Sequence, residues 1–236
     1  FSDKFKFKSN IRYTDTYLQY DKVIDTATAT HDEEVDGTEA SYNIGFVYDI
    51  NKKFTNNLTF TNTYIKRIYA ATKNSGNALQ DNYYGNRYAL SYTGSYNFNL
   101  DNSVVFGFER EDDGIGYNKD LSGRKNKYNY VTSKFFDFQN RITNNFYFTF
   151  GSRFDEHSIA GNEDSHRATF AYLFNDKSLK IKSSYGTGFR YPSLYEMFFV
   201  YAANSESLGN VKAENSKSFD IGFEKFIRDL NLNIET

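Results

Sequence analysis

The chain of 236 residues contains no cysteine, no tryptophan, one methionine and a single proline, Pro192. Without cysteine it can form neither disulfides nor a thiolate nucleophile, and the redox compartment stays open. Because proline cannot donate to a β-ladder, its scarcity permits long uninterrupted strands. Nucleophile motifs of the Gly-x-Ser-x-Gly type and glycine-rich phosphate loops are also missing. The sequence therefore predicts that the protein is not an enzyme.

Long apolar runs and an excess of charge of one sign are missing as well. No segment reaches the roughly 20 apolar residues of a membrane-spanning helix. The 28 basic and 30 acidic residues are interspersed and give a net charge of -2, which argues against nucleic acid as a partner. Hydrophobic residues make up only 39% of the chain, and the mean hydropathy is -0.70. Such a composition does not build a large water-excluding core.

Aromatic residues are abundant instead, at 19% of the chain. In the segment 146–155, Phe146, Phe148, Phe150 and Phe154 alternate with mainly polar residues. Successive side chains of a strand point to opposite faces, so one face is apolar and the other polar. A strand of about 9–11 residues crosses a bilayer with only alternate residues apolar. This pattern predicts an all-β fold, a transmembrane antiparallel β-barrel; a soluble β-sandwich, with usually shorter strands, is the alternative.

About eleven strands are expected, joined by connections that are alternately short and long. The expected strands cover 3–19, 39–50, 56–67, 82–98, 103–110, 127–139, 144–156, 165–174, 179–188, 216–226 and 229–236. The short connections are 51–55, 99–102, 140–143, 175–178 and 227–228, and the long ones are 20–38, 68–81, 111–126, 158–164 and 189–215. Outer-membrane barrels place short turns on the periplasmic side and long loops outside. Since the chain starts and ends in alternating sequence, we expect a piece of a longer barrel.

The alternation also assigns residues to the two faces of the sheet. The residues expected to face lipid are Tyr42, Ile44, Phe46, Tyr48, Tyr88, Leu90, Tyr92, Tyr96, Phe98, Val104, Phe106, Phe108, Phe170, Tyr172, Phe174, Ile181, Tyr185, Phe219, Ile221 and Phe223. Those expected to face the lumen are Ser41, Asn43, Asp49, Arg87, Ser91, Thr93, Ser95, Glu109, Arg167, Lys180, Lys182, Ser184, Asp220 and Glu224. A Lys or Arg at the lipid midplane costs about 2–4 kcal/mol, which explains the segregation. With Phe135, Phe136 and Phe138 close together, the facing of 127–139 stays open.

Two segments resemble the barrel of TonB-dependent outer-membrane receptors. Residues 183–196 read Ser-Ser-Tyr-Gly-Thr-Gly-Phe-Arg-Tyr-Pro-Ser-Leu-Tyr-Glu, and residues 208–216 read Leu-Gly-Asn-Val-Lys-Ala-Glu-Asn-Ser before a further alternating strand. In that family a Ser-Tyr-Gly-Thr-Gly-Phe-Lys-Ala-Pro-Ser-Leu-like run precedes a loop, and a Gly-Asn-Pro-Asn-Leu-Lys-Pro-Glu-Lys-Ser-like run opens the next strand. Tyr191 stands where the family often has Ala, and 210–214 lacks the usual prolines. Segments 12–16, 45–49 and 151–158 also fit, so the resemblance covers nearly the whole chain.

The resemblance is greatest to cobalamin transporters and siderophore receptors. It implies a 22-strand barrel in the bacterial cell outer membrane, of which residues 1–236 form part of a single barrel domain. It also implies an N-terminal plug domain that is absent from this chain, and as partners outer-membrane lipid and the TonB complex. The implied function is import of a scarce large ligand, either a cobalamin-like corrinoid or a ferric siderophore. A passive porin and a rim-active outer-membrane hydrolase, using His157 or His166, remain alternatives.

The connection 189–215 is the first candidate for ligand contact, because its aromatic residues have neither lipid nor a core to bury them. The candidate ligand-binding residues are Arg190, Tyr191, Tyr195, Phe198, Phe199 and Tyr201. Packing of these rings on neighbouring loops is the alternative. Just before them, Gly186 and Gly188 are expected on the lumen side, where they allow either close approach of another backbone or a bulge.

Acidic residues crowd the connection 25–39. Calcium takes six to eight oxygen ligands, so an acidic extracellular loop could bind it. The candidate calcium ligands are Asp25, Asp32, Glu33, Glu34 and Asp36; a solvated acidic loop is the alternative. His157 and His166 flank the connection 158–164 and could meet as a transition-metal pair, or simply be polar rim residues. No other cofactor is expected.

Overall fold

The computed structural model describes residues 3–21, 32–72, 78–118, 125–174, 178–200, 211–227 and 232–235. Within these ranges, eleven strands form one sheet in which each strand pairs antiparallel with the next in sequence. The strands are β1 (Phe5–Asp21), β2 (Asp32–Asn51), β3 (Phe54–Thr72), β4 (Ala78–Asn97), β5 (Asn102–Asn118), β6 (Lys125–Arg141), β7 (Phe146–His157), β8 (Gly161–Leu173), β9 (Leu179–Arg190), β10 (Glu214–Ile227) and β11 (Leu232–Glu235). A π-helical segment, η1 (Glu196–Val200), lies between β9 and β10. No helix in the described ranges is long and apolar enough to cross a membrane.

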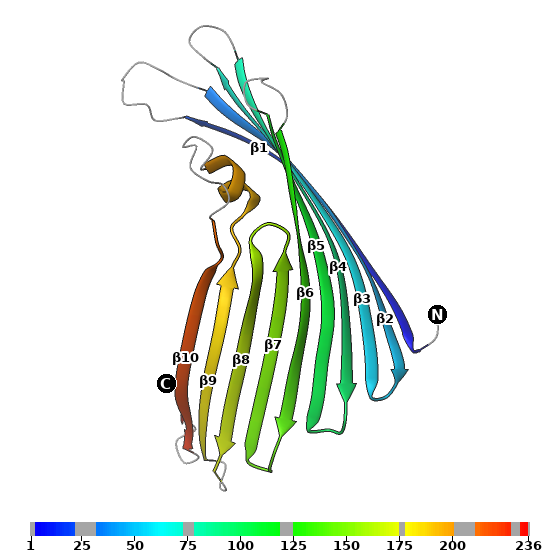
Figure 1. The fold of residues 1–236 in the computed structure, drawn as a ribbon, viewed down its shortest axis with the longest axis vertical. Helices are drawn as coiled ribbons and strands as arrows, with labels where there is room; N and C mark the ends of the chain where they lie inside the picture. The colour runs from blue at the N-terminus through cyan, green and yellow to red at the C-terminus, as the bar shows by residue number, and fades with distance from the viewer. Residues whose placement is uncertain are drawn as a thin grey trace.

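The sheet is open and curved, with β1 at one edge and β10 near the other (Figure 1). The segment that carries η1 lies on the hollow side, below the upper ends of β1–β5 (Figure 1). Strands that pair only with their sequence neighbours give the up-and-down topology of membrane barrels. The predicted all-β antiparallel architecture with about eleven strands is therefore confirmed.

The strand register confirms the predicted separation of apolar and polar faces. Leu58 pairs with Tyr92, and Tyr92 pairs with Phe108, so aromatic and aliphatic residues form a continuous outer surface. Arg87 pairs with Asp113 on the other face, and both line a cavity on the hollow side of the sheet. The register, followed from strand to strand, puts the residues predicted to face lipid on the outer face, except Phe98 and Phe174, which lie just beyond the ends of β4 and β8. It puts the residues predicted for the lumen on the concave face.

The three neighbouring phenylalanines of β6 keep the alternation. Phe136 and Phe138 pair with outer-face residues of β5 and continue the apolar outer surface. Phe135 points to the concave side and pairs with Gly107, where an added Cβ would collide with the phenylalanine ring. Glycine thus makes room for one ring on the polar face. The pairing of Phe135 with Gly107 thus settles which face each phenylalanine of β6 occupies, which the sequence had left open.

Several strands extend further than the aromatic alternation predicted. β2 begins at Asp32 rather than at residue 39, β3 ends at Thr72 rather than at 67, and β5 ends at Asn118 rather than at 110. The predicted connections 68–81 and 111–126 are largely strand, and 20–38 is strand at 20–21 and 32–38, its residues that the structure describes. Beyond the hydrocarbon both faces of a sheet can carry polar side chains, so the ladder continues where the apolar alternation has stopped. The predicted extents of these connections were wrong for that reason.

The connection predicted to be long at 158–164 is a turn of three residues. β7 ends at His157 and β8 begins at Gly161. Gly161 has a φ of 89°, a left-handed conformation that glycine adopts without a Cβ clash. A short hairpin turn is commonly followed by a residue in this conformation. The prediction was wrong because the polar residues after Gly161 continue the strand.

The ladder between β8 and β9 is shorter than β8 itself. It runs from the pair Leu173 and Lys180 to the pair Arg167 and Gly186. Beyond that point side chains join the two segments: the His166 amide donates to Thr187 Oγ1 at 2.9 Å. The hydroxyl of Tyr191, which follows β9, donates to the Gly161 carbonyl at 3.1 Å. We call this stretch the β8–β9 seam.

The two glycines of β9 lie on the concave side as predicted. Gly186 pairs with Ser218 and Gly188 with Ser216, without a register shift between β9 and β10. The bulge alternative is therefore wrong. A Cβ on Gly188 would lie 3.1 Å from Ser216 Oγ, so the absence of a side chain here allows close approach of β10.

Candidate functional site

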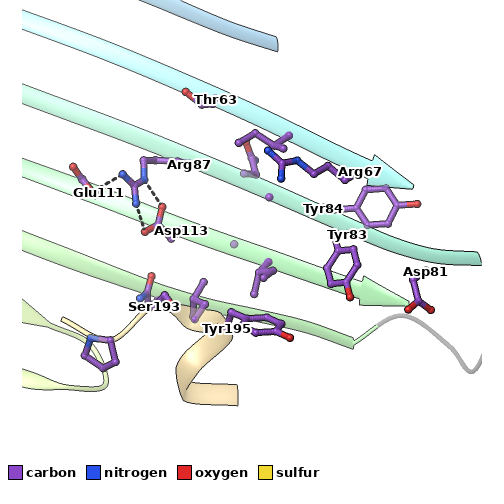
Figure 2. A pocket seen from close by; sticks show the side chains of 18 of the residues that line it. Thr63, Arg67, Asp81, Tyr83, Tyr84, Arg87, Glu111, Asp113, Ser193 and Tyr195 are labelled. Carbon is purple, nitrogen blue, oxygen red and sulfur yellow. Dashed lines mark hydrogen bonds and ion pairs between the residues drawn. The ribbon is translucent and has the colours of Figure 1, made fainter. Parts of the chain in front are cut away.

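A cavity of about 1340 Å³ lies on the concave side, between the upper parts of the N-terminal strands and residues 191–195. Figure 2 shows Tyr83, Arg87 and Asp113 projecting from β4 and β5, with Ser193 and Tyr195 on the opposite side. Alternate residues of neighbouring strands reach the same space because strands have a period of two. The cavity is thus walled by the sheet on one side and by a single irregular segment on the other.

Tyrosine rings gather around one end of this cavity. Tyr83 stacks on Tyr117 with ring centroids 4.8 Å apart, and it meets Tyr69 edge to face at 5.5 Å. Burial, together with the Tyr117 hydroxyl, raises the pKa of Tyr83 above its ordinary value, so its hydroxyl stays protonated. Tyr195 approaches from the opposite wall (Figure 2). Such rings bind partly apolar ligands by stacking and still offer hydroxyl groups.

Charged side chains line the same cavity. The Arg87 guanidinium binds the Asp113 carboxylate at 2.6 and 3.0 Å and lies 3.7 Å from Glu111; this fork geometry fixes all three groups. Arg67 also lines the cavity and has no ion pair within the described residues. Asp81 Oδ1 is buried and lacks a hydrogen-bond partner there. Among the described residues, the cavity therefore presents a cation without an ion pair and at least one unused acceptor to a ligand.

Tyr191 fastens the irregular segment to the end of the β7–β8 hairpin. Its hydroxyl donates to the Asp155 carbonyl at 3.2 Å and to the Gly161 carbonyl at 3.1 Å. Its ring lies 4.7 Å from the buried His157 ring, centroid to centroid. Burial raises the pKa of Tyr191 to about 12, so the hydroxyl remains a donor at neutral pH.

His157 in turn organises the tight turn that follows it. Its Nδ1 accepts the backbone N–H groups of Ile159 and Ala160 at 3.0 and 2.9 Å. Burial lowers the pKa of His157, which agrees with a neutral ring that accepts at Nδ1. The proton is then on Nε2, 2.9 Å from the side-chain amide of Asn129, which accepts it when its oxygen faces the ring.

Glu196 closes the segment at the start of η1. It accepts the backbone N–H of Ser193 at 2.7 Å, and the Arg190 guanidinium lies 3.2 Å from its carboxylate. The Ser193 amide, followed by Arg190, lowers the pKa of Glu196 to about 2. The Met197 amide also donates to the Ser193 carbonyl at 2.9 Å. These bonds hold residues 193–197 in one compact turn.

The predicted ligand-binding residues do not all reach the cavity. Tyr191 and Tyr195 line it. Arg190 lies outside the lining and pairs with Glu196 and Glu214, while Phe198 lies under the Lys127 ammonium at 4.7 Å. The side chain of Phe199 and all of Tyr201 lie outside the described residues.

The predicted calcium ligands are divided between places. Asp25 and the side chain of Asp32 lie outside the described residues. Glu33 lines the cavity, whereas Glu34 and Asp36 are on the other face of β2, where Glu34 accepts from Tyr17 at 2.9 Å. Among the described residues no group of three metal-ligating side chains is found. Calcium binding by the full set stays a prediction.

The histidines His157 and His166 do not form the metal pair considered from the sequence. The register puts His157 on the concave face with Val131 and Glu111, and His166 on the outer face with Ser152. They are separated by the sheet itself, because they differ by an odd number of positions along the hairpin.

Most residues that line the cavity were not among the predicted ligand contacts, and Arg67, Asp81 and Tyr83 are three of them. The signal that could have found them is parity. All three lie on the same face as Arg87, which was assigned to the lumen. Arg67 and Tyr83 fall in the expected strands 56–67 and 82–98, whereas Asp81 falls in the expected connection 68–81. The alternation of faces along a strand assigns no direction to a residue such as Asp81 once its segment has been taken for a loop.

The family model described as TonB dependent receptor-like, beta-barrel, matches residues 1–235. The chain belongs to the TonB-dependent receptor β-barrel family. Membership confirms the resemblance drawn from segments 183–196 and 208–216. No curated protein sequence matches the chain.

Solved TonB-dependent receptors and related transporters share the fold. The ferric-catecholate import receptor Fiu from K12 E. coli superimposes with a TM-score of 0.72 at 12% identity, covering 98% of this chain and 48% of Fiu. The copper transporter OprC gives 0.75 at 11% identity, covering 95% and 40%. The outer membrane transporter YddB from Escherichia coli gives 0.74 at 13% identity, covering 96% and 36%. This chain spans less than half the length of each, and at these identities the likeness shows the fold alone.

Proposed function

We propose that the protein is the barrel part of a TonB-dependent receptor that imports a scarce, large ligand across the bacterial outer membrane. In this proposal residues 1–236 belong to a single barrel domain, and the plug domain and the TonB-contacting residues lie outside the chain. Lipid surrounds the outer face, the short connections face the periplasm and the cavity opens to the exterior. Family membership supports this, because the solved relatives are named as receptors, importers and transporters.

The observation that carries the proposal is the tyrosine-lined cavity walled by residues 191–195. Its volume of about 1340 Å³ exceeds the roughly 300–1000 Å³ of ordinary small-molecule pockets. It combines the edge-to-face rings of Tyr69 and Tyr83 with Arg67, which has no ion pair within the described residues. Stacking and a cation together suit a bulky ligand that carries aromatic or ring-rich surface and at least one anionic group.

A ferric siderophore is the ligand we favour, and a corrinoid is the second candidate. Three solved relatives are named for ferric complexes: Fiu as a ferric-catecholate import receptor, FecA as a ferric citrate transporter and BauA as a ferric preacinetobactin receptor. They are 8–15% identical to this chain. Tyr191 and Tyr195 are the predicted loop residues that we retain as cavity-wall contacts; the other loop residues and the calcium site stay predictions.

Binding to cells that carry the full-length receptor tests the proposal. Iron-labelled siderophores and labelled cyanocobalamin serve as probes, compared between wild type, Tyr83→Ala and Tyr88→Ala. Tyr88 is the matched control because it lies on the same strand, is 45% exposed and faces outward. We expect Tyr83→Ala to weaken binding about tenfold or more, the effect of losing an aromatic anchor worth at least about 1.4 kcal/mol. Equal losses in the two variants contradict the site.

The same experiment separates import from passive diffusion. A receptor binds its ligand saturably and loses uptake in cells without TonB, whereas a porin shows neither behaviour. Labelled ligand that enters at a rate proportional to its concentration, with or without TonB, supports the porin alternative and refutes the proposed receptor.

A further inference from the structure

Three side chains on the outer face form a hydrogen-bonded chain far from the cavity lining. Ser152 belongs to β7, and Asp164 and His166 belong to β8. Ser152 Oγ lies 2.8 Å from His166 Nδ1, and His166 Nε2 lies 2.5 Å from Asp164 Oδ2. Ser152 and His166 are a register pair. A serine, an imidazole and a carboxylate are thus linked in the order that nucleophilic catalysis uses.

One tautomer of His166 satisfies both bonds. A carboxylate accepts and does not donate, so Nε2 carries the proton and donates it to Asp164. Nδ1 is then unprotonated and accepts the Ser152 hydroxyl. In this state the imidazole can act as a general base toward the serine while the carboxylate fixes its orientation. His157 lacks this capacity, because its Nδ1 already accepts two backbone amides.

Ser152, His166 and Asp164 lie where the outer face would meet lipid, if the barrel is oriented in the membrane as in the proposed function. Ser152 is the seventh residue of β7, roughly 15–18 Å above its lower end at about 3.3 Å per residue and a tilt of about 40°. The apolar band of such barrels is about 25 Å tall. The serine therefore lies in the outer half of the membrane. Ionisable side chains facing lipid are costly, and a functional reason is the default expectation.

Exposure increases along the chain from the serine to the carboxylate. Ser152 is 6% exposed, whereas the side chains of His166 and Asp164 are 40% and 58% exposed. The Phe154 ring packs against the imidazole at 76°, with centroids 6.1 Å apart. The nucleophile thus lies in an apolar setting beside a phenylalanine that can contact an acyl chain, and the carboxylate reaches toward the polar interface.

We propose that Ser152 is an activated nucleophile that hydrolyses a carboxylic ester of an amphiphile held in the outer half of the membrane. Ser152 Oγ attacks the ester carbonyl carbon while His166 Nδ1 takes the hydroxyl proton. The ester C–O bond breaks, and the alcohol leaves with that proton. A water molecule, deprotonated by His166, then attacks the acyl-serine, releases the fatty acid and restores the hydroxyl. Asp164 is a positioning residue that orients the ring and stabilises the imidazolium.

Lys134 supplies positive charge beside this site. It pairs with Phe154 on the outer face and is therefore diagonal to Ser152, about 7–8 Å away along the sheet. A lysine side chain spans that distance. Lys134 is exposed and forms no ion pair within the described ranges. Its ammonium group can stabilise the anionic oxygen of the intermediate, a contribution that often dominates acyl-transfer catalysis.

An alkyl fluorophosphonate tests the nucleophile directly, because an activated serine displaces its fluoride and keeps the phosphonyl group. The full-length receptor in outer-membrane vesicles is treated and digested, and the adduct is located by mass spectrometry. We expect an adduct on Ser152 in the wild type. In His166→Ala the adduct should form at least about 100-fold more slowly, because a general base usually contributes a factor of that size. Ser165→Ala is the matched control, since Ser165 lies next to His166 on β8 but faces the concave side. Ser152 in this variant should be labelled at the wild-type rate.

The outcomes decide the proposal one way or the other. No adduct on Ser152, or equal labelling rates in wild type and His166→Ala, overturns it. Each variant is first shown to migrate as a folded, heat-modifiable barrel, and His166→Gln, which keeps the size of the ring, must also slow labelling. Hydrolysis of 4-nitrophenyl decanoate should exceed that of 4-nitrophenyl acetate; equal rates overturn the assignment to amphiphiles. None of these measurements involves ligand uptake, so failure of the proposed import function is distinguishable from failure here.

Discussion

Replacing Tyr191 by Phe removes one hydroxyl and leaves the ring against His157. That hydroxyl is shared between the carbonyls of Asp155 and Gly161 at 3.2 and 3.1 Å, and it is the side-chain bond that ties the cavity wall to the β7–β8 hairpin. A single hydrogen bond of this kind contributes about 0.5–1.5 kcal/mol. Local opening of residues 191–197 should therefore become about 2–13 times more frequent, since 1.4 kcal/mol is a factor of ten.

Hydrogen–deuterium exchange measures that opening. The Met197 amide, which donates to the Ser193 carbonyl, reports on the segment, and its exchange rate should rise by the same 2–13-fold factor. Tyr185→Phe is the control because Tyr185 lies on β9, is 45% exposed and faces outward; it should leave the rate unchanged. An unchanged Met197 rate in Tyr191→Phe refutes the reasoning that this hydroxyl holds the wall in place.

Two further predictions concern the turn after β7 and the two faces of β5. Burial lowers the pKa of His157 below its ordinary value of 6.5, so the opened turn binds a proton that the closed turn does not; the stability of the turn is complete above about pH 6.5 and declines below it. The protection factors of the Ile159 and Ala160 amides, which are exchange rates corrected for the intrinsic rate at each pH, should fall between pH 7 and pH 5, and a flat profile counts against the buried neutral ring. Phe106→Arg should cost about 2–4 kcal/mol of folding free energy in lipid vesicles. Val105→Arg, beside Asp137 on the concave face, should cost much less folding free energy when both variants are unfolded with urea. Equal costs would contradict the assignment of Phe106 to the outer face and Val105 to the concave face.

The faces of the sheet could be predicted because the bilayer imposes a simple rule on each side chain. Phe106 and Glu109 differ by an odd number of positions, so they lie on opposite faces of the sheet, the apolar Phe106 on the outer face and Glu109 on the concave face. The number and order of strands followed from the same rule. Strand ends did not, because beyond the lipid the rule no longer applies: β2 continues to Asp32 with carboxylates on both faces.

The candidate site was predicted less completely than the fold. Tyr191 and Tyr195 could be singled out as aromatic residues without an obvious place to be buried. The partners that place them come from distant parts of the chain, since the Tyr191 ring depends on His157 and the cavity on strands as far away as β1. Arg190 was a plausible ligand contact, but two carboxylates, Glu196 and Glu214, already neutralise it. Pairing across a folded sheet is not readable from local pattern.

The β8–β9 seam has an evolutionary consequence. Along most of the wall, neighbouring strands are joined by main-chain bonds that almost any amino acid can make. At the seam the joining groups are the side chains of Thr187 and Tyr191, whose identity a single nucleotide change can alter. Natural selection can thus loosen or tighten this part of the rim, and with it the mouth of the cavity, by point mutation alone, leaving the remainder of the architecture untouched.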